Sequence, residues 1–303
     1  MTKKAIVTLA DSNYFEMLKE LIESIKRFPQ SKDVDICVLD AGLTDPEIKE
    51  LKNKVYQIKK AEWDIKVPNY KIFRKEWLKS QVSRAFLPNY FPEFDKFLWI
   101  DSDAWVNSWD CVELYFKACD KKKLGITQTL GPGYRIMSKV KWLFGSIAKI
   151  KSQNYKHARS SGIDEKSART IAFAPHLNIG VFSLEKTSSI WKIWQDNLRK
   201  TLSKGKIFGS EGLAINLSVY IDQVETEFLP ISCNWIVSNL LPKYNIQKSI
   251  FVEPFLPNNE IGIMHLAAGI WVNNKDMRLN KNLKIPIEDL DGKKHLISLR
   301  YSA

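Results

Sequence analysis

The sequence has few cysteines and no long apolar run. Its four cysteines are scattered along 303 residues, so they form neither the close spacing of a zinc site nor a disulfide framework, and we expect reduced thiols. No stretch offers the ~20 uncharged apolar residues that a membrane-spanning helix needs. The opening MTKKAIVTLADSNY lacks the apolar core and cleavage site of a secretory signal. We therefore expect a cytoplasmic protein.

The sequence also has fewer acidic than basic residues. The chain has 34 Asp and Glu against 46 Lys and Arg, a formal charge of +12. Such a balance favours anionic partners, namely nucleotide phosphates, anionic lipid headgroups or nucleic acid. The basic residues recur along the chain and are densest between Lys139 and Arg159. Because they are dispersed and no RNA-binding motif accompanies them, we expect no nucleic-acid partner.

The first hundred residues alternate between apolar strands and amphipathic helices. Continuous apolar runs predict buried strands at 5–10, 34–42, 55–58 and 96–100. Helical spacing of apolar residues, with Pro or cap residues at the ends, predicts helices at 15–28, 44–54 and 76–88. This βαβαβ order predicts an α/β fold with a mostly parallel sheet that helices cover.

The second half is less regular. We expect strands at 124–129 and 176–184 and helices at 188–203 and 209–221. Short strands at 226–229, 250–253 and 261–266 would complete the sheet. The simplest organisation is one domain over residues 1–270, followed by a C-terminal tail over 271–303.

Two aspartates interrupt the most apolar stretch, FLWIDSDAWV at 97–106. Asp101 follows the strand directly, and Asp103 lies two residues on, across Ser102. Ligands of open parallel sheets bind outside the carboxyl ends of the strands, and paired carboxylates there suit Mg²⁺ or Mn²⁺ beside a phosphate. Asp and Ser are equally common in turns, so the pair alone leaves both readings open.

Four segments in order resemble glycosyltransferases of the GT-A fold, in particular glycosyltransferase family 8. They are TLADSNY (8–14), SRAFLPNYFPEFDKFLWIDSDAWV (83–106), HLNIGVFSLEK (176–186) and IMHLAAG (263–269). The resemblance spans roughly residues 5–270. It implies a GT-A-like mixed, mostly parallel sheet with helices on both faces, a donor-binding half over 1–106 and an acceptor-side half over 107–270.

The resemblance also implies a site. Its metal ligands, for Mn²⁺ or Mg²⁺, would be Asp101, Asp103 and His265. Its donor-binding residues would be Ala10, Asp11, Asn13, Arg84, Ser102, Gly180, Gly269 and Lys275. Its catalytic residues, beside the transferred sugar, would be Arg84, Asn178 and Glu211. The implied reaction moves a hexose from a UDP-sugar, with retention of configuration, to a hydroxyl of a saccharide, lipid-linked or protein acceptor.

The sequence departs from the family near the transferred sugar. In GSEGLAIN, Glu211 stands for the family's acid and Gly212 for its glutamine. Gly269 follows the late histidine by four residues rather than three, and no proline follows Lys275. These departures concern the sugar and not the metal or the nucleotide.

Several of these residues have structural alternatives. Asp11 and Asn13 can cap the helix that starts near Tyr14, and we expect both roles. Arg84 can pair with Glu93 or Asp95 on a helix surface, and His265 can be a core histidine. Asn178 and Gly180 can form a bulge, and Glu211 can cap its helix with Ser210. His176 matches no ligand position, and we expect it to be structural.

The basic stretch KVKWLFGSIAKIK at 139–151 has apolar residues at helical spacing, which predicts an amphipathic helix. Such a helix either packs its apolar stripe on the protein or lies on an anionic membrane, so a peripheral contact with the inner face of a membrane stays open. Two other classes also remain: a sugar nucleotidyltransferase, and a non-catalytic basic module that binds nucleic acid or membrane. The loop ADSNY lacks the glycine-rich phosphate loop of the former.

Overall fold

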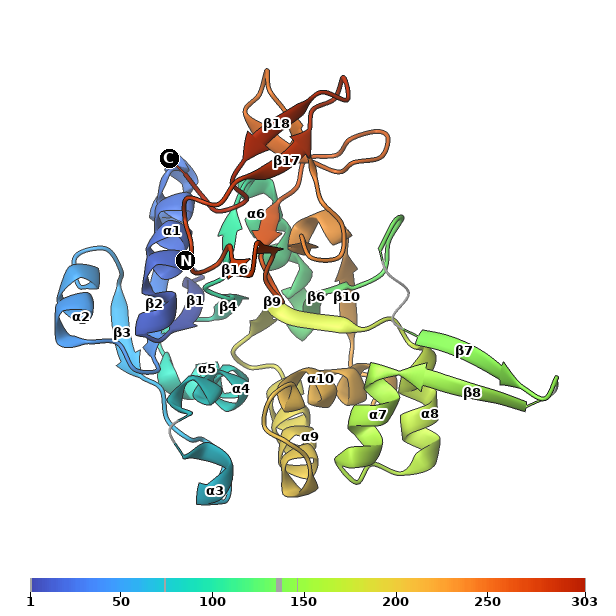
Figure 1. Ribbon diagram of the computed structural model, residues 1–303. Helices are drawn as coiled ribbons and strands as arrows, with labels where there is room; N and C mark the ends of the chain where they lie inside the picture. The colour runs from blue at the N-terminus through green and yellow to red at the C-terminus, as the bar shows by residue number, and fades with distance from the viewer. Residues whose placement is uncertain (1, 74, 135–137, 146, 303) are drawn as a thin grey trace.

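A seven-stranded sheet forms the centre of the protein (Figure 1). The computed structural model describes residues 2–73, 75–134, 138–145 and 147–302. The sheet runs in the order β10-β6-β9-β4-β1-β2-β3. Its strands are β1 (Lys4–Ala10), β2 (Asp35–Asp40), β3 (Gln57–Lys60), β4 (Lys96–Ile100), β6 (Leu124–Gln128), β9 (Leu177–Glu185) and β10 (Thr226–Leu229). All pairs are parallel except those of β9, which is antiparallel to β4 and β6. The predicted mixed, mostly parallel sheet is confirmed.

Helices cover both faces of this sheet. Alternate residues of each strand point to opposite sides, so the strands present apolar side chains to both helical layers. Ile6 and Leu98 pack against α1 (Phe15–Lys26) and α6 (Trp109–Ala118). Val7 and Trp99 belong to the other apolar layer, with α9 (Ile190–Lys204) and α10 (Ser210–Tyr220). On the edge, α2 (Asp45–Leu51) begins with Thr44 as N-cap and Glu47 completing a capping box. The predicted coverage by helices is therefore confirmed.

The helix predicted at 76–88 is a series of short turns instead. They are η3 (Glu76–Lys79), α4 (Ser80–Ser83), η4 (Arg84–Phe86) and α5 (Leu87–Tyr90). Pro88 lies in the first turn of α5, where its missing N–H costs nothing. The N-cap residue of α5, Phe86, has a non-helical ψ of 18°. A continuous helix would place this proline in its interior. The preceding α3 (Asn69–Ile72) is a single turn.

The basic stretch folds as a β-hairpin, so the predicted amphipathic helix is wrong. β7 (Ser138–Leu143) pairs antiparallel with β8 (Ile147–Ser152). Between them Phe144 and Gly145 have φ of 51° and 75°, values that a right-handed helix cannot contain. The same apolar residues also fit alternation, and β-branched Val140, Ile147 and Ile150 favour it. Two helices follow, α7 (Gln153–Ser160) and α8 (Glu165–Phe173).

Smaller sheets build the rest of the molecule. β5 (Ala104–Val106), β11 (Trp235–Ile236) and β14 (Ile263–His265) form a three-stranded sheet in the order β11-β14-β5. Hairpins are formed by β12 (Lys243–Asn245) with β13 (Ile250–Val252), β15 (Trp271–Val272) with β16 (Lys275–Asp276), and β17 (Ile285–Glu288) with β18 (Lys294–Ile297). The short 3-10 turns are η1 (Ser12–Tyr14), η2 (Pro29–Asp33), η5 (Asp120–Lys122) and η6 (Ile231–Asn234). Of the three late strands expected in the main sheet, only β10 joins it.

The last thirty residues pack closely on the body of the protein. The backbone carbonyl of Leu299 accepts a hydrogen bond of 2.9 Å from the Trp105 indole N–H. Arg300 donates from Nε and Nη2 to both carboxylate oxygens of Glu20, at 2.9 and 2.8 Å, and both residues are buried. This bidentate pair ties the end of the chain to α1.

The four cysteines are free and buried, as expected from their spacing. Within the described part of the chain, no helix combines the length and the apolar content that crossing a bilayer requires.

Candidate active site

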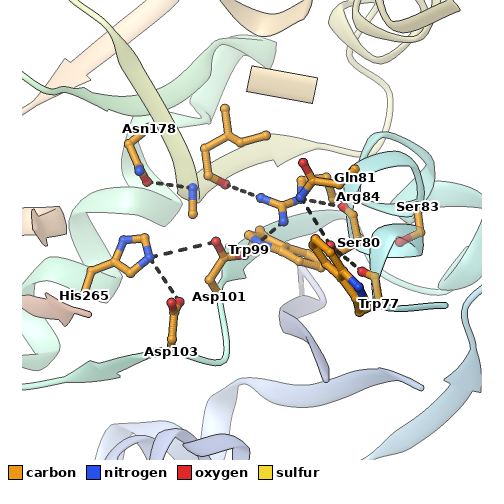
Figure 2. A network of polar contacts seen from close by, with 12 residues as sticks. Trp77, Ser80, Gln81, Ser83, Arg84, Trp99, Asp101, Asp103, Asn178 and His265 are labelled. Atoms are coloured by element: carbon orange, nitrogen blue, oxygen red, sulfur yellow. Dashed lines mark hydrogen bonds and ion pairs between the residues drawn. The ribbon is translucent and has the colours of Figure 1, made fainter. Parts of the chain in front are cut away.

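The two aspartates leave the carboxyl end of β4 in a tight turn. The Ala104 N–H donates to the Asp101 carbonyl at 3.0 Å, and the Asp101 N–H donates to the carbonyl of Gly180 on the neighbouring strand β9 at 2.7 Å. Ser102 between them is buried. The backbone is therefore a turn, as one reading proposed, and the same turn directs both carboxylates toward His265 (Figure 2).

His265 comes to the aspartates from the other side, at the end of β14. That strand pairs antiparallel with β5, which places His265 opposite Ala104. Its Nε2 lies 3.2 Å from Asp103 Oδ1 and 3.9 Å from Asp101 Oδ2. One ligand atom from each of the three residues lies within 4.8 Å of the others. Strands distant in the sequence thus bring the predicted ligands together.

Asn234 fixes the orientation of the histidine. The Nδ1 of His265 lies 2.8 Å from Asn234 Oδ1, an acceptor, so Nδ1 carries the proton. Nε2 is then the nitrogen that faces the carboxylates, and in the neutral imidazole it carries the lone pair with which histidine binds a metal. Two carboxylates and one neutral imidazole form a donor set that suits Mn²⁺.

The electrostatics of this group favour a bound cation. Burial raises the pKa of Asp101, although Arg84 opposes the shift. Burial would also raise the pKa of Asp103, but His265 beside it and Arg278 hold that pKa below its ordinary value. Burial alone would lower the pKa of His265, yet the two aspartates raise it. Burial and the neighbouring carboxylate both raise the pKa of Asp101, and the two carboxylates raise that of His265. A divalent cation would neutralise this buried negative charge.

Gly180 makes room for this cluster. A Cβ at this position would lie 2.2 Å from His265 Cε1 and 2.8 Å from Asp101 Oδ2. Any other residue would therefore push the histidine and the aspartate apart. Gly180 was predicted as a donor-binding residue, and the close approach gives a physical reason for glycine there.

Arg84 is buried under the aspartates and does not lie on the surface. Its Nη2 is 3.2 Å from Asp101 Oδ1, and its Nε and Nη1 donate to the carbonyls of Ser80 and Ile179 at 2.9 and 3.1 Å. The guanidinium carbon also lies 4.8 Å from the ring centroid of Trp99, whose indole N–H donates to Asp101 Oδ1 at 2.7 Å. The alternative pairing with Glu93 or Asp95 is wrong. Arg84 and Trp99 together hold one oxygen of Asp101 and leave the other toward His265.

Asn178 and Glu211 border the cluster. Asn178 Oδ1 accepts from the Gly180 N–H at 2.9 Å and from Asn234 Nδ2 at 3.1 Å. The β6–β9 pairing is irregular in this part of β9, so the bulge reading also holds. With Oδ1 occupied, Nδ2 is the part of the Asn178 side chain that could donate to a ligand.

Glu211 lies in the first turn of α10 and is buried. Its Oε2 has no hydrogen-bond partner within the described residues. Burial raises the pKa of Glu211 to about 7, with Arg84 opposing the shift. Ser210, the proposed co-cap, instead bonds the Lys206 carbonyl through its hydroxyl. At Gly212 a Cβ would meet nothing within 4 Å, so open space stands where the resemblance expects a glutamine.

The predicted nucleotide-binding residues lie at the carboxyl end of β1, the strand next to β4. Ala10 ends β1, and Asp11 caps the turn η1 by accepting from the Tyr14 N–H at 3.3 Å. Asn13 Nδ2 donates to Asp11 Oδ2 at 3.0 Å. The capping role is thus present. Burial raises the pKa of Tyr14, and Asp103 and Asp11 both add to this shift, so Tyr14 lies near both carboxylates.

The two late donor residues, Gly269 and Lys275, lie in different surroundings. Gly269 has φ of 69°, and a Cβ there would lie 2.7 Å from Asp276 Oδ1, so the position requires glycine. Lys275 is exposed on β16. A cation on the Asp103 side of the cluster is Arg278, whose Nη1 lies 3.6 Å from Asp103 Oδ2 while Asp276 holds its Nε and Nη2 at 2.9 and 2.7 Å.

Two residues of this site were missed. Arg278 lies only three residues beyond Lys275, but nothing in the local sequence distinguishes it from the other basic residues of the segment. Asn234 sits in the turn before β11, and no local pattern marks it. Only the pairing of β11 with β14 brings it to His265.

Comparisons with known proteins agree with this geometry. The family described as "Glycosyl transferase family 8" matches residues 5–184, more than half of the chain. No curated protein sequence matches. Among solved structures, the apo form of the bifunctional glycosyltransferase WbbM is similar with a TM-score of 0.55 and 15% identity, over 91% of this chain and 48% of that one. This chain therefore spans about half the length of WbbM.

A second structure, the galactosyltransferase LgtC in complex with donor and acceptor sugar analogs, is similar with a TM-score of 0.49 and 15% identity over 86% of each chain. The match to WbbM shows a shared fold. The chain thus belongs to glycosyl transferase family 8, has the GT-A fold and is a glycosyltransferase.

Proposed function

We propose that this glycosyltransferase moves a hexose from a UDP-sugar to a hydroxyl group, with Mn²⁺ or Mg²⁺ held by Asp101, Asp103 and His265. The acceptor would be a saccharide, free, lipid-linked or on a protein. The observation that carries the proposal is the orientation of His265, whose Nδ1 is engaged by Asn234 while Nε2 faces both carboxylates. When bound, the ion would neutralise the donor diphosphate and stabilise charge on the departing UDP.

The chain's own residues would prepare this site in three ways. Arg84 and Trp99 keep Asp101 Oδ1 fixed, which orients the other oxygen toward the metal position. Arg278 adds positive charge on the Asp103 side, where a phosphate oxygen would approach. Asp11 and Asn13, at the end of the neighbouring strand, would seat the uridine.

Other residues would supply access and donor contacts. Ala10 and Ser102 would contact the nucleotide through backbone and hydroxyl groups, and Lys275 would add charge from the exposed hairpin. Gly180 and Gly269 would keep the backbone open to the donor. A side chain at either position would collide with site residues, because its Cβ would lie less than 3 Å from them.

The sugar would lie between Asn178 and Glu211. The Asn178 amide can donate to a sugar hydroxyl, and the unpartnered Oε2 of Glu211 can take up another. With a pKa of about 7, Glu211 is partly protonated near neutrality and can donate as well as accept. We propose transfer with retention because the resemblance to family 8 implies it, whereas inversion would need a general base near the acceptor. The anomeric configuration of the product by proton NMR tests this part.

The test of the reaction is release of UDP from a panel of UDP-sugars with water as the default acceptor, with and without Mn²⁺. We expect metal-dependent release for one donor, and at least a hundredfold loss in Asp103→Asn. Asp110→Asn, at an exposed position in the same segment, is the matched control and should retain full activity. No release, together with no Mn²⁺-dependent UDP binding by calorimetry, would overturn the proposal. Release of pyrophosphate from UTP and a sugar phosphate would instead indicate a nucleotidyltransferase.

A further inference from the structure

The net positive charge of the chain comes mostly from one segment. Between Asp120 and Asp164 there is no acidic residue, whereas ten of the 46 Lys and Arg fall there. The rest of the chain has 36 basic and 34 acidic residues and is nearly neutral. Six of the ten belong to the β7–β8 hairpin and the helix after it: Lys139, Lys141, Lys149, Lys151, Lys156 and Arg159.

The hairpin extends away from the body of the protein (Figure 1). Within the described residues, β7 and β8 form a sheet of their own and join no other strand. A two-stranded hairpin is only marginally stable in water without a further packing surface. An extended hairpin of this kind is therefore suited to a partner outside the domain.

The register sets the lysines directly against one another. Lys139 is opposite Lys151, and Lys141 is opposite Lys149. Like charges in directly opposed positions destabilise a strand pair, and the hairpin contains no acid to offset them. This arrangement weakens the isolated hairpin and favours it when an anionic surface lies beside the lysines.

The tip of the hairpin is apolar and exposed. Trp142 is 65% exposed and Phe144 94% exposed, and Leu143 and Ile147 end the two strands next to them. On β7, Lys141 directly precedes Trp142. On β8, Lys149 follows Ile147 by two residues. Tryptophan and phenylalanine partition into the interfacial region of bilayers, and lysines set slightly back from them can reach the headgroups.

We propose that the β7–β8 hairpin docks on an anionic membrane surface, with Trp142 and Phe144 entering the interface and the two basic strands lying against the lipid headgroups. The occupant follows from charge complementarity, since all four charges of the hairpin are positive, and from the aromatic tip, which a soluble polyanion would not require. The attachment is independent of the transfer reaction. It would hold the enzyme where an acceptor carried on a lipid is concentrated.

The test is cosedimentation of the full chain with vesicles of neutral phosphatidylcholine, with and without 30% phosphatidylglycerol. Wild type should bind the anionic vesicles at least tenfold more tightly and lose binding as salt rises. A variant with Lys139, Lys141, Lys149 and Lys151 changed to Gln should lose at least tenfold, because each lysine near such a surface contributes about fivefold.

The matched control changes four exposed lysines elsewhere, Lys32, Lys52, Lys200 and Lys248, to Gln and has the same net charge. It should bind within about twofold of wild type, whereas Trp142→Ser/Phe144→Ser should bind several-fold more weakly even with all lysines present.

Equal binding by the hairpin and control lysine variants would overturn the proposal, as would failure of wild type to bind. Wild type that prefers an RNA oligomer to the vesicles would assign the surface to nucleic acid and overturn it too. UDP release with water as acceptor, measured without vesicles, should be the same in all variants. Loss of vesicle binding and loss of transfer are thus distinguishable.

Discussion

Replacing Glu211 by glutamine is expected to stabilise the metal-free protein at neutral and higher pH. Burial raises the pKa of Glu211 from its ordinary 4.5 to about 7 in the folded state. Between these values the unfolded chain releases the proton while the folded chain retains it, so stability falls as pH rises through this window. About 2.5 pKa units at ~1.36 kcal/mol each make the loss on the order of 3 kcal/mol by pH 8. Glutamine does not titrate, so the variant avoids this loss.

The assay is urea unfolding of wild type and Glu211→Gln in EDTA at pH 4, 5, 6, 7 and 8. The difference in unfolding free energy should be flat up to about pH 4.5 and then grow in favour of the variant to roughly 3 kcal/mol. An unsatisfied glutamine amide would shift the whole curve without changing its slope. Glu288→Gln, at an exposed position, should give a difference that changes little with pH. A difference for Glu211→Gln that is constant from pH 4 to 8 would refute the reasoning.

Three further variants test the packing and the orientation of the site. Gly180→Ala should abolish Mn²⁺ binding by calorimetry, since its Cβ would lie 2.2 Å from His265 Cε1; unchanged affinity would contradict the close approach. Asn234→Ala should weaken Mn²⁺ binding about 10- to 100-fold while the protein stays folded by circular dichroism, because the histidine loses its orienting partner. Arg300→Leu should cost about 3–5 kcal/mol in urea unfolding, because it leaves buried Glu20 with only Lys281, 3.9 Å away, as a charged partner. Glu20→Gln in that background should recover part of the cost; a cost below about 1 kcal/mol would mean that the pair is not buried in solution.

The central sheet could be predicted because its strands carry their signal locally. Runs such as AIVTLA and KFLWI are apolar throughout, which happens when both faces of a strand are covered. The pattern cannot give strand direction, however. β9 has the same kind of apolar run, yet it is antiparallel to both of its neighbours, β4 and β6.

The stretch at 139–151 shows where periodicity fails. Its apolar residues satisfy helical spacing and partly satisfy alternation, so the pattern alone could not decide between a helix and a hairpin. Phe144 and Gly145 decided it by adopting positive φ. A glycine in the middle of a proposed helix was the local sign of this outcome.

The metal ligands could be predicted from the sequence, while the residues that position them could not. Asp101 and Asp103 are marked by standing at the end of an apolar strand, and His265 ends another. Asn234 and Arg278 are common residues in irregular segments. They reach the cluster through sheet pairing and a turn that depend on the whole fold.

The free-energy cost of burying three acidic side chains in this site points to a bound ligand. Asp101 and Asp103 are neighbouring acids in a buried turn, and Glu211 is a buried acid with an unpartnered oxygen. Each is unfavourable in the unliganded protein, and hydrophobic residues in their place would be more stable. Arg84 lowers the cost for both Asp101 and Glu211, so one buried cation links the metal side of the site to the sugar side. A donor with a cation on its diphosphate and hydroxyls on its sugar would satisfy both sides at once, and binding one part should therefore strengthen binding of the other.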